Sequence, residues 1–481
     1  MNRNLLILFC SLFAYSSIGQ LQVQQLKTEN LRNPIGIESK QPRFSWQLVS
    51  PKKNVVQTAY ELTVNQGNKT VWTSGKVASA ASLFNVYRGN VLPSNTLFSW
   101  KVRVWDNQGQ VSDWATASFQ TALNKEDWSA KWINSGIVAD TTNGIVPMLR
   151  KTFQTQKKVV RATAYVTARG MYEVEMNGAR VGNAYLSPGW TTYSKHLQYQ
   201  AYDVTSLVTS GKNAIGVRLG SGWYRTRLGW ENKQHIYGKE TALLFQLAIT
   251  YADGSKETII SDKSWKASDS EITYAEIYNG ESIDARKRKA NWSKGTFDDS
   301  NWTNVVEKDF PSDYINASIN EPIRKHEAFK PVRVFTSPKG ETILDFGQNL
   351  VGWIALNATG KAGDKITLSH FEMLDKFGNP YFDNLRSAKA QATYTLSGNG
   401  TDAFEPHFTF FGFRYVKVDG LKGAVNPTDF TAYALYSDME QTGSFECSNP
   451  LVNQLQKNIQ WGQKGNFLDV PTDCPQRDER L

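Results

Sequence analysis

The 481-residue sequence predicts a mainly β protein in which tandem β-sandwich modules precede the start of a helical domain. Short segments that alternate apolar and polar residues, divided by Gly, Pro and Asn, fill most of the chain, as strands and turns do. Aromatic residues make up 12% of the chain and include 15 Trp, which is enough to fill several sandwich cores. A helical period appears only near the end of the sequence.

The first module, 20–124, contains the segments "RFSWQL", "AYELTV", "TLFSWKVRVWD" and "ASFQTAL". About seven short strands in ~100 residues predict a fibronectin- or immunoglobulin-like sandwich. The second module, 127–308, carries Asn177-Gly178 between alternating segments, which is a strong hairpin signal. Its strand–turn rhythm predicts a larger, jelly-roll-like sandwich. The third module, 321–437, is again rich in strand segments with Gly at the turns, and it predicts a further sandwich.

The last segment, 443–481, changes character. Leu451, Leu455 and Ile459 recur every four residues, and Ser448 before them predicts the N-cap of a helix. A chain that is β for most of its length and then becomes helical is expected to stop at the threshold of a further domain.

The N-terminus predicts export. Residues 1–19 hold one basic residue, an apolar run and then small residues, which is the pattern of a signal peptide cleaved after Gly19. The apolar run of about ten residues is too short for a membrane span, which needs about 20. The mature protein is therefore expected in the periplasm or outside the cell. Cleavage removes Cys10 and leaves Cys447 and Cys474, enough for one disulfide.

Charge and composition exclude some classes of protein. The net charge of +9 is spread over the chain, and the longest basic run, "ARKRKA" at 285–290, is short. No nucleic-acid-binding motif accompanies it, so no nucleic-acid partner is expected. The five His residues show no metal-ligand spacing.

The stretch "DVPTDCPQRDERL", 469–481, concentrates the chemistry of the chain. Glycoside hydrolysis commonly needs two carboxyl groups, one of which must stay protonated beside negative or apolar neighbours. Asp473, Asp478 and Glu479 supply such carboxyls, and Arg477 and Arg480 can orient carboxylates or sugar hydroxyls. The alternative is a hydrophilic loop whose charges pair with one another. Residue chemistry alone leaves both interpretations open.

The same stretch closely resembles the catalytic-loop motif of bacterial α-L-rhamnosidases, glycoside hydrolase family 78. The resemblance covers the whole mature chain in the family's order. "LRNPIGIESKQPRFSWQL" resembles its fibronectin-like module, and "MNGARVGNAYLSPGWTTYSKHLQYQAYDVT" resembles its jelly-roll module. "DFGQNLVGWI" with "FTFFGFRYV" resembles the sandwich that precedes its catalytic domain.

This resemblance implies inverting hydrolysis of terminal α-L-rhamnosyl bonds in an (α/α)6 barrel, with no required cofactor and with rhamnose-containing glycosides as partners. Glu479 matches the general acid, and Asp473, Arg477 and Asp478 match substrate-binding positions. No residue matches the family's second glutamate, the general base, or the Gly-Trp-Thr-Gly-Asp continuation of the motif. The chain is therefore expected to be an N-terminal portion that is inactive alone.

Two further hypotheses concern the jelly-roll module. Trp223, Tyr224 and Trp230 cluster in "GSGWYRTRLGW"; core packing and hairpin anchoring are the default interpretation, and an ancillary rhamnose site is the further hypothesis. A second cluster has oxygen ligands suitable for calcium, although its spacing is not that of an EF-hand; its members are Asn279, Glu281 and Asp284. From another class of function, a non-catalytic carbohydrate-binding or adhesion protein with three β modules also fits the residues.

Overall fold

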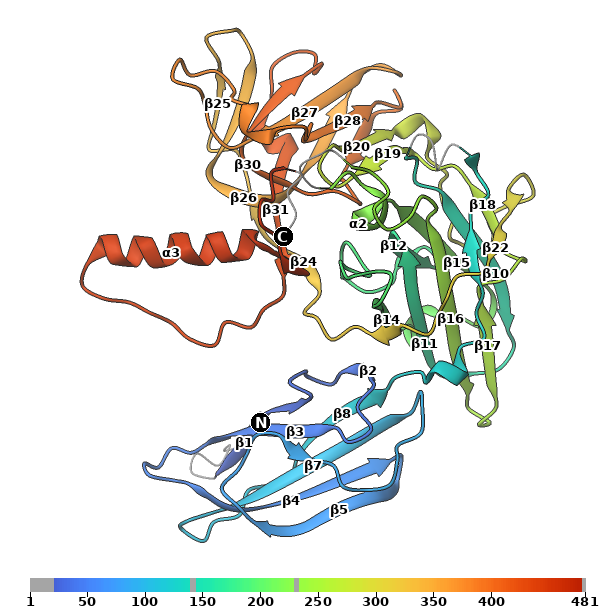
Figure 1. The fold of residues 1–481 in the computed structure, drawn as a ribbon, viewed down its shortest axis with the longest axis vertical. Helices are drawn as coiled ribbons and strands as arrows, with labels where there is room; N and C mark the ends of the chain where they lie inside the picture. Colours follow the sequence, from blue (N-terminus) through green and yellow to red (C-terminus); the bar gives the residue numbers. More distant parts are fainter. Residues whose placement is uncertain (1–20, 139–143, 229–232, 478–481) are drawn as a thin grey trace, which may run out of the picture. The chain divides into compact units, whose positions relative to one another are not determined.

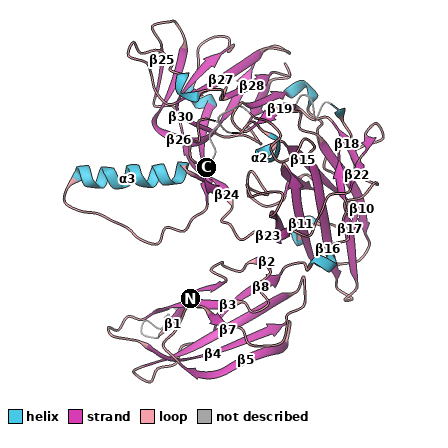
Figure 2. Ribbon diagram, viewed as in Figure 1, coloured by secondary structure: helices cyan, strands magenta, loops and turns pink. Residues whose placement is uncertain are grey.

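The computed structural model describes residues 21–138, 144–228 and 233–477 (Figure 1). These residues fall into two compact units, one ending at Asp127 and the other beginning at Trp128. The protein is mainly β (Figure 2), as predicted. Within the described ranges, α3, Pro450–Gly465, is the only α-helix longer than four residues.

The first unit is a two-sheet sandwich. Its sheets have the strand orders β1-β3-β6 and β2-β8-β7-β4-β5. Strand β7 alternates strictly, so Phe98, Trp100, Val102 and Val104 all point into the core. The strands are β1 (Gln22–Thr28), β2 (Ile35–Ile37), β3 (Arg43–Val49), β4 (Gln57–Gln66), β5 (Lys69–Ala78), β6 (Asn85–Val86), β7 (Leu97–Asp106) and β8 (Ala115–Thr121).

The jelly-roll module of the second unit also has two sheets, ordered β13-β12-β15-β10-β18-β21 and β22-β9-β16-β11-β14-β23, with β17 beside β16. The predicted hairpin is confirmed: Asn177 and Gly178 have φ values of 53° and 87°, as a two-residue turn between β12 and β13 needs. The strands are β9 (Trp132–Asn134), β10 (Met148–Thr155), β11 (Val159–Arg169), β12 (Met171–Met176), β13 (Ala179–Arg180), β14 (Leu197–Asp203), β15 (Gly211–Gly220), β16 (Ala242–Tyr251), β17 (Lys256–Ile260), β18 (Lys266–Ser268), β21 (Thr303–Asn304), β22 (Val306–Lys308) and β23 (Ile315–Ala317).

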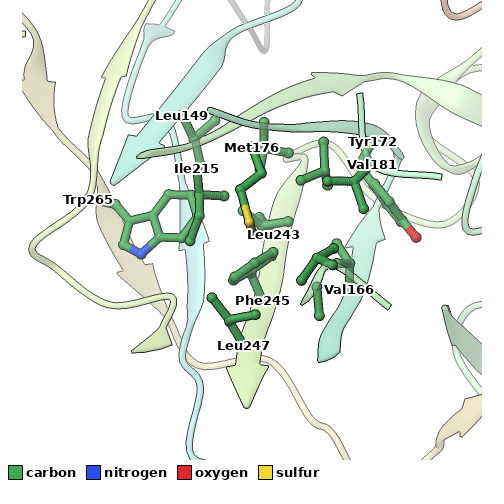
Figure 3. Close-up of a cluster of buried hydrophobic side chains, with 14 of the residues drawn as sticks. Leu149, Val166, Tyr172, Met176, Val181, Ile215, Leu243, Phe245, Leu247 and Trp265 are labelled. Carbon is green, nitrogen blue, oxygen red and sulfur yellow. The ribbon is translucent and has the colours of Figure 1, made fainter. Parts of the chain in front are cut away.

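The core of the jelly-roll module lies between these two sheets. Leu149 and Ile215 come from one sheet and Leu243 and Phe245 from the other, and all four are fully buried (Figure 3). Trp265 packs against Phe245 with ring centroids 5.6 Å apart. Burying aromatic and aliphatic side chains of this size stabilises each sheet pair by about 1.5–3 kcal/mol per side chain.

Besides the two jelly-roll sheets, the second unit contains a ten-stranded sheet, called the third sheet below. Its strands are ordered β19-β20-β28-β27-β30-β26-β31-β24, with β25 and β29 also paired to β26. The 18-residue strand β26 changes partners along its length and so links all these strands into one sheet. The strands are β19 (Ile272–Glu276), β20 (Gly280–Asp284), β24 (Ile323–Phe329), β25 (Arg333–Thr336), β26 (Thr342–Thr359), β27 (Lys365–Phe371), β28 (Gln391–Thr395), β29 (Thr401–Phe404), β30 (Phe411–Asp419) and β31 (Phe430–Ser437).

The strands of 321–437 are linked by hydrogen bonds into one network, which also takes in two strands from outside that range. Strands β19 and β20 fall inside the predicted jelly-roll range of 127–308, but β20 pairs in parallel with β28 and so belongs to the third sheet. The close pairing requires glycine at position 280, where φ is +104° and an added Cβ would lie 1.8 Å from the carbonyl oxygen of Gln391.

The helix α3 begins one residue later than predicted. Asn449, not Ser448, is the N-cap, because its side-chain oxygen accepts from the Leu451 amide at 2.9 Å and Pro450 occupies the first helical position. The predicted apolar residues Leu451 and Leu455 are 79% and 56% exposed. The other end of α3 is held, since Trp461 packs edge-on against Phe329 at 5.6 Å.

Two further expectations concern cysteines and membranes. Cys447 and Cys474 are not bonded to each other, so the disulfide that the sequence allows is not formed. Across the described parts of the chain, no helix combines the length and the apolar composition needed to cross a bilayer.

Candidate active-site loop

The stretch that begins at Asp469 follows α3 as a tight hairpin. Strands β32 (Phe467–Leu468) and β33 (Val470–Pro471) pair across Asp469, which takes a φ of 71° at the tip. Aspartate tolerates this left-handed conformation better than most residues. Leu468 and Thr472 are buried on either side of the tip, and the Thr472 amide donates to the carbonyl of Asn466 at 2.8 Å. The two buried side chains and the hydrogen bond of Thr472 therefore fix the backbone at the start of the loop.

Asp469 itself contacts three segments that are distant in sequence. Its Oδ2 accepts from the backbone amide of Trp190 at 2.7 Å, and its Oδ1 accepts from Nδ2 of Asn320 at 3.1 Å. Its own amide donates to Oγ of Ser437, at the end of β31, at 2.9 Å. Burial raises the pKa of Asp469, although the hydrogen bonds from Asn320 and Trp190 lower it.

The jelly-roll loop that receives Asp469 is shaped for this contact. Gly189 has a φ of +103°, and a Cβ there would lie 2.4 Å from Oδ2 of Asp469. The Trp190 indole stacks on Trp223 with centroids 5.8 Å apart and planes 8° from parallel. Only a residue without a side chain at 189 leaves room for the carboxylate.

The loop also touches the third sheet. A Cβ at Gly412, in β30, would lie 3.1 Å from the backbone nitrogen of Gln476. The Arg477 amide donates to the Cys474 carbonyl at 3.4 Å, closing a turn. The loop residues 469–477 thus lie against both the jelly-roll module and the third sheet.

The predicted site residues are only partly within the described chain. Asp473 is exposed and Arg477 is half-buried in this loop. Glu479 and Asp478 lie outside the described residues, as does Arg480. An exposed carboxylate on a loop that is anchored at its start can meet a ligand from solvent, which suits a sugar-binding role for Asp473.

The aromatic residues proposed for an ancillary sugar site are placed differently from the prediction. Trp223 is fully buried and Tyr224 nearly so, and Trp223 packs between Trp190 and Phe410. A ring without solvent exposure cannot stack on a sugar, so the prediction for Trp223 is wrong and core packing is its role. Trp230 lies outside the described residues.

The three candidate calcium ligands already have protein partners. Glu281 accepts from the amides of His407 and Phe408, and Asp284 pairs with Arg286 at 2.7 Å. Asn279 donates to Glu276 at 2.5 Å. Among the residues that the structure describes, no group of three or more His, Cys, Asp or Glu side chains is arranged to hold a metal.

A buried ionic cluster joins the jelly-roll module to the third sheet. Glu173 of β12 accepts from Nη1 of Arg180 at 2.6 Å and from Nδ1 of His407 at 2.8 Å. Burial alone would raise the pKa of Glu173, but the charges of His407 and Arg180 hold it well below its usual range. Burial raises the pKa of the neighbouring Glu281 to about 7. pKa shifts like those of Glu173 and Glu281 also occur in ion pairs that have only a structural role. Neither residue lies in the loop at 469–477.

Comparison with known families gives four consecutive matches along the chain. Residues 23–125 match the Rha78A-like N-terminal immunoglobulin domain, and 157–327 match the alpha-L-rhamnosidase N-terminal domain. Residues 335–436 match the bacterial alpha-L-rhamnosidase concanavalin-like domain. Residues 440–481 match the bacterial alpha-L-rhamnosidase 6 hairpin glycosidase domain, so the loop that begins at Asp469 lies in the glycosidase match.

The chain belongs to the bacterial α-L-rhamnosidase family.

Individual relatives agree with this assignment to the α-L-rhamnosidase family. An alpha-L-rhamnosidase of Formosa agariphila is 37% identical over 97% of this chain and 52% of its own length. One of Alteromonas sp. (strain LOR) is 35% identical, over 98% of this chain and 54% of its own length. The chain thus spans about half the length of these curated relatives.

Solved α-L-rhamnosidase structures share the fold. The native enzyme of Aspergillus terreus superimposes with a TM-score of 0.91 at 38% identity, covering 96% of this chain and 54% of that one. The Streptomyces avermitilis enzyme, solved with L-rhamnose, gives a TM-score of 0.91 at 30% identity, over 96% of this chain and 62% of that one.

Sequence reasoning did not identify Asp469, Trp190 or Asn320 as site residues. Asp469 opens the quoted motif, and Trp190 lies in the "SPGWTTY" part of the jelly-roll stretch that carries the family resemblance. The two residues are 279 positions apart, and no local period can pair positions at that separation.

Proposed function

We propose that the protein hydrolyses terminal, non-reducing α-L-rhamnosyl residues with inversion at the anomeric carbon. The observation that carries the proposal is the glycosidase match at 440–481, which contains the acidic motif ending at Glu479. The substrates are rhamnose-containing oligosaccharides, polysaccharides or glycosides. Binding of L-rhamnose in the Streptomyces avermitilis relative supports this class of substrate.

In the proposed mechanism Glu479 is the general acid that protonates the leaving oxygen. Asp473, Arg477 and Asp478 hold the sugar. Inversion requires a second carboxylate about 6.5–9.5 Å away to activate water on the opposite face of the ring. No residue of this chain is assigned to that role, and we propose that an (α/α)6 barrel supplies it together with the walls of the pocket.

A non-catalytic carbohydrate-binding or adhesion protein is the weaker candidate. Three β modules alone would fit it, but a glycosidase match after them does not. Reading the coding DNA beyond Leu481 separates the two. A continuation rich in amphipathic helices with a later glutamate favours the enzyme, and a stop directly after Leu481 favours the binding protein.

We also propose that the protein is exported, with a mature N-terminus near Gln20, and mass spectrometry of the exported product tests this. Calcium binding by the jelly-roll module, through Asn279, Glu281 and Asp284, stays a prediction. Thermal unfolding of the 481-residue chain with calcium or with EDTA tests it, because a ligand that binds only the folded state raises the melting temperature.

The activity itself is tested on two kinds of rhamnoside. In the full-length product, Glu479→Gln should abolish hydrolysis of an unactivated rhamnoside, because general-acid catalysis contributes about 10²–10⁴-fold. Turnover of p-nitrophenyl α-L-rhamnoside should fall far less, because its leaving group needs no proton. Equal, mild losses on both substrates would remove Glu479 from the acid role.

A further inference from the structure

Asp469 lies four residues before Asp473 and ten before Glu479, at the start of the sequence motif that contains both. The loop begins in a two-residue β pairing, β32 with β33, and its tip is Asp469. Any shift of the tip moves the loop that follows it. The position of Asp469 therefore affects where Asp473, four residues further on, lies.

The jelly-roll loop on which Asp469 rests is itself rigid. The hydroxyl of Tyr193 donates to the Gly189 carbonyl at 2.7 Å, and Nε2 of Gln200 donates to the Pro188 carbonyl at 3.0 Å. Trp190 is fixed by its stack on the buried Trp223. The amide that binds Asp469 is thus presented by a loop whose own backbone is tied down.

Asp469 is half-buried, and a carboxylate that is partly removed from water is costly unless its oxygens are hydrogen-bonded. At Asp469 each oxygen has a different partner, the Trp190 amide or the Asn320 side chain. Two bonds from different segments fix both the place and the rotation of the carboxylate, whereas one bond would leave it free to pivot. An Asn at the tip would also tolerate the φ of 71°, so the turn alone does not explain a half-buried aspartate.

We infer that Asp469 is a positioning residue of the glycosidase: it fixes the catalytic-motif loop to the jelly-roll module, so that this module forms part of the active-site support. The inference rests on the proposed function. It assigns to the jelly-roll loop around Gly189 and Trp190 a role in catalysis that does not require the loop to bind sugar.

Leaving-group dependence separates positioning of the acid from general stabilisation. A misplaced general acid harms substrates whose leaving oxygen must be protonated, and misplacement by about 1 Å can cost about 100-fold. Loss of folded enzyme lowers the turnover of every substrate by the same factor. The ratio of the two rates therefore reports on the acid alone.

The test uses Asp469→Ala and Asn320→Ala in the full-length enzyme, with Asp345→Ala as the matched control. Asp345 is a carboxylate of the same unit that is more deeply buried than Asp469, and it accepts from Nε of Arg414 at 2.9 Å and from the Gly347 amide at 2.8 Å. For Asp469→Ala, kcat on an unactivated rhamnoside should fall about 100-fold while kcat on the p-nitrophenyl substrate falls less than about tenfold. Asn320→Ala should act in the same direction more weakly, and Asp345→Ala should lower both rates equally.

A second measurement does not depend on activity. In the 481-residue chain, Asp469→Ala should speed hydrogen exchange at the Trp190 amide about tenfold, and Asp345→Ala should not. Unchanged exchange, or equal losses of kcat on both substrates, overturns the inference. A wild-type enzyme that is inactive on both substrates removes the proposed function and this positioning role together, while the exchange result still shows whether the contact exists.

Discussion

Nδ1 of His407 donates to Oε2 of Glu173 over 2.8 Å, across the joint between the jelly-roll module and the third sheet. The side chain of Glu173 is only 6% exposed, and Arg180 binds its other oxygen. Removing the charge of Glu173 leaves two half-buried basic side chains, Arg180 and His407, without their counter-ion.

Glu173→Gln should therefore lower the free energy of unfolding of this unit by about 3–5 kcal/mol, the cost of breaking a buried pair. Urea denaturation followed by tryptophan fluorescence measures it. The control is Asp253→Asn, whose partner Lys157 is 54% exposed, and it should cause little measurable loss. Similar small effects for both variants would show that the Glu173 pair does not support the joint.

Glu281, beside the same joint, should make stability depend on pH. Its folded-state pKa is about 7, above the ordinary 4.5, because burial disfavours the charge. Between these values the folded protein holds a proton that the unfolded chain has released, so the free energy of unfolding should fall as pH rises from about 4.5 to 7. The raised pKa of His407 acts in the same direction at higher pH.

Glu281→Gln removes this titration. The difference in unfolding free energy, variant minus wild type, should rise with pH across the same window, as measured by urea titrations at pH 5, 6, 7 and 8 (about one-unit steps). A difference that stays constant with pH would show that Glu281 titrates normally in the folded protein.

Gly280→Ala tests the close pairing of β20 with β28. The added Cβ would lie 1.8 Å from the Gln391 carbonyl oxygen, and φ is +104°. Strain and overpacking together should cost about 2–5 kcal/mol. Gly254→Ala is the control, because its φ is +82° but no atom lies within 4 Å, so only about 1 kcal/mol is expected. Equal melting temperatures for the two variants would contradict the observed pairing.

The anchoring of α3 is tested by limited proteolysis. Trp461 packs on Phe329, and Lys464 pairs with Glu327 at 2.7 Å, whereas Leu455 is 56% exposed. Trp461→Ala should speed cleavage within 439–465, because it frees the helix from β24 and β31. Leu455→Ala should leave the rate unchanged. If both variants are cleaved at the wild-type rate, the contact of Trp461 does not hold the helix.

The sequence by itself determined the class of this protein and the local elements. Alternation in segments such as Leu97–Asp106 predicts strands, Asn177-Gly178 predicts a hairpin, and the four-residue spacing from Leu451 predicts a helix, because each signal is complete within a short window. The motif from Asp473 to Glu479 and the order of the modules identified the family.

Only the tertiary structure decided which distant residues meet. In the structure β20 lies beside β28, and Trp223 is buried. Glu281 accepts hydrogen bonds from two backbone amides, and Asp469 accepts one from the Trp190 amide, 279 positions away. These outcomes depend on which surfaces pack together once the strands exist. The sequence does not show whether the side chain of an aspartate faces solvent or is buried, because residues that are distant in the sequence determine its exposure.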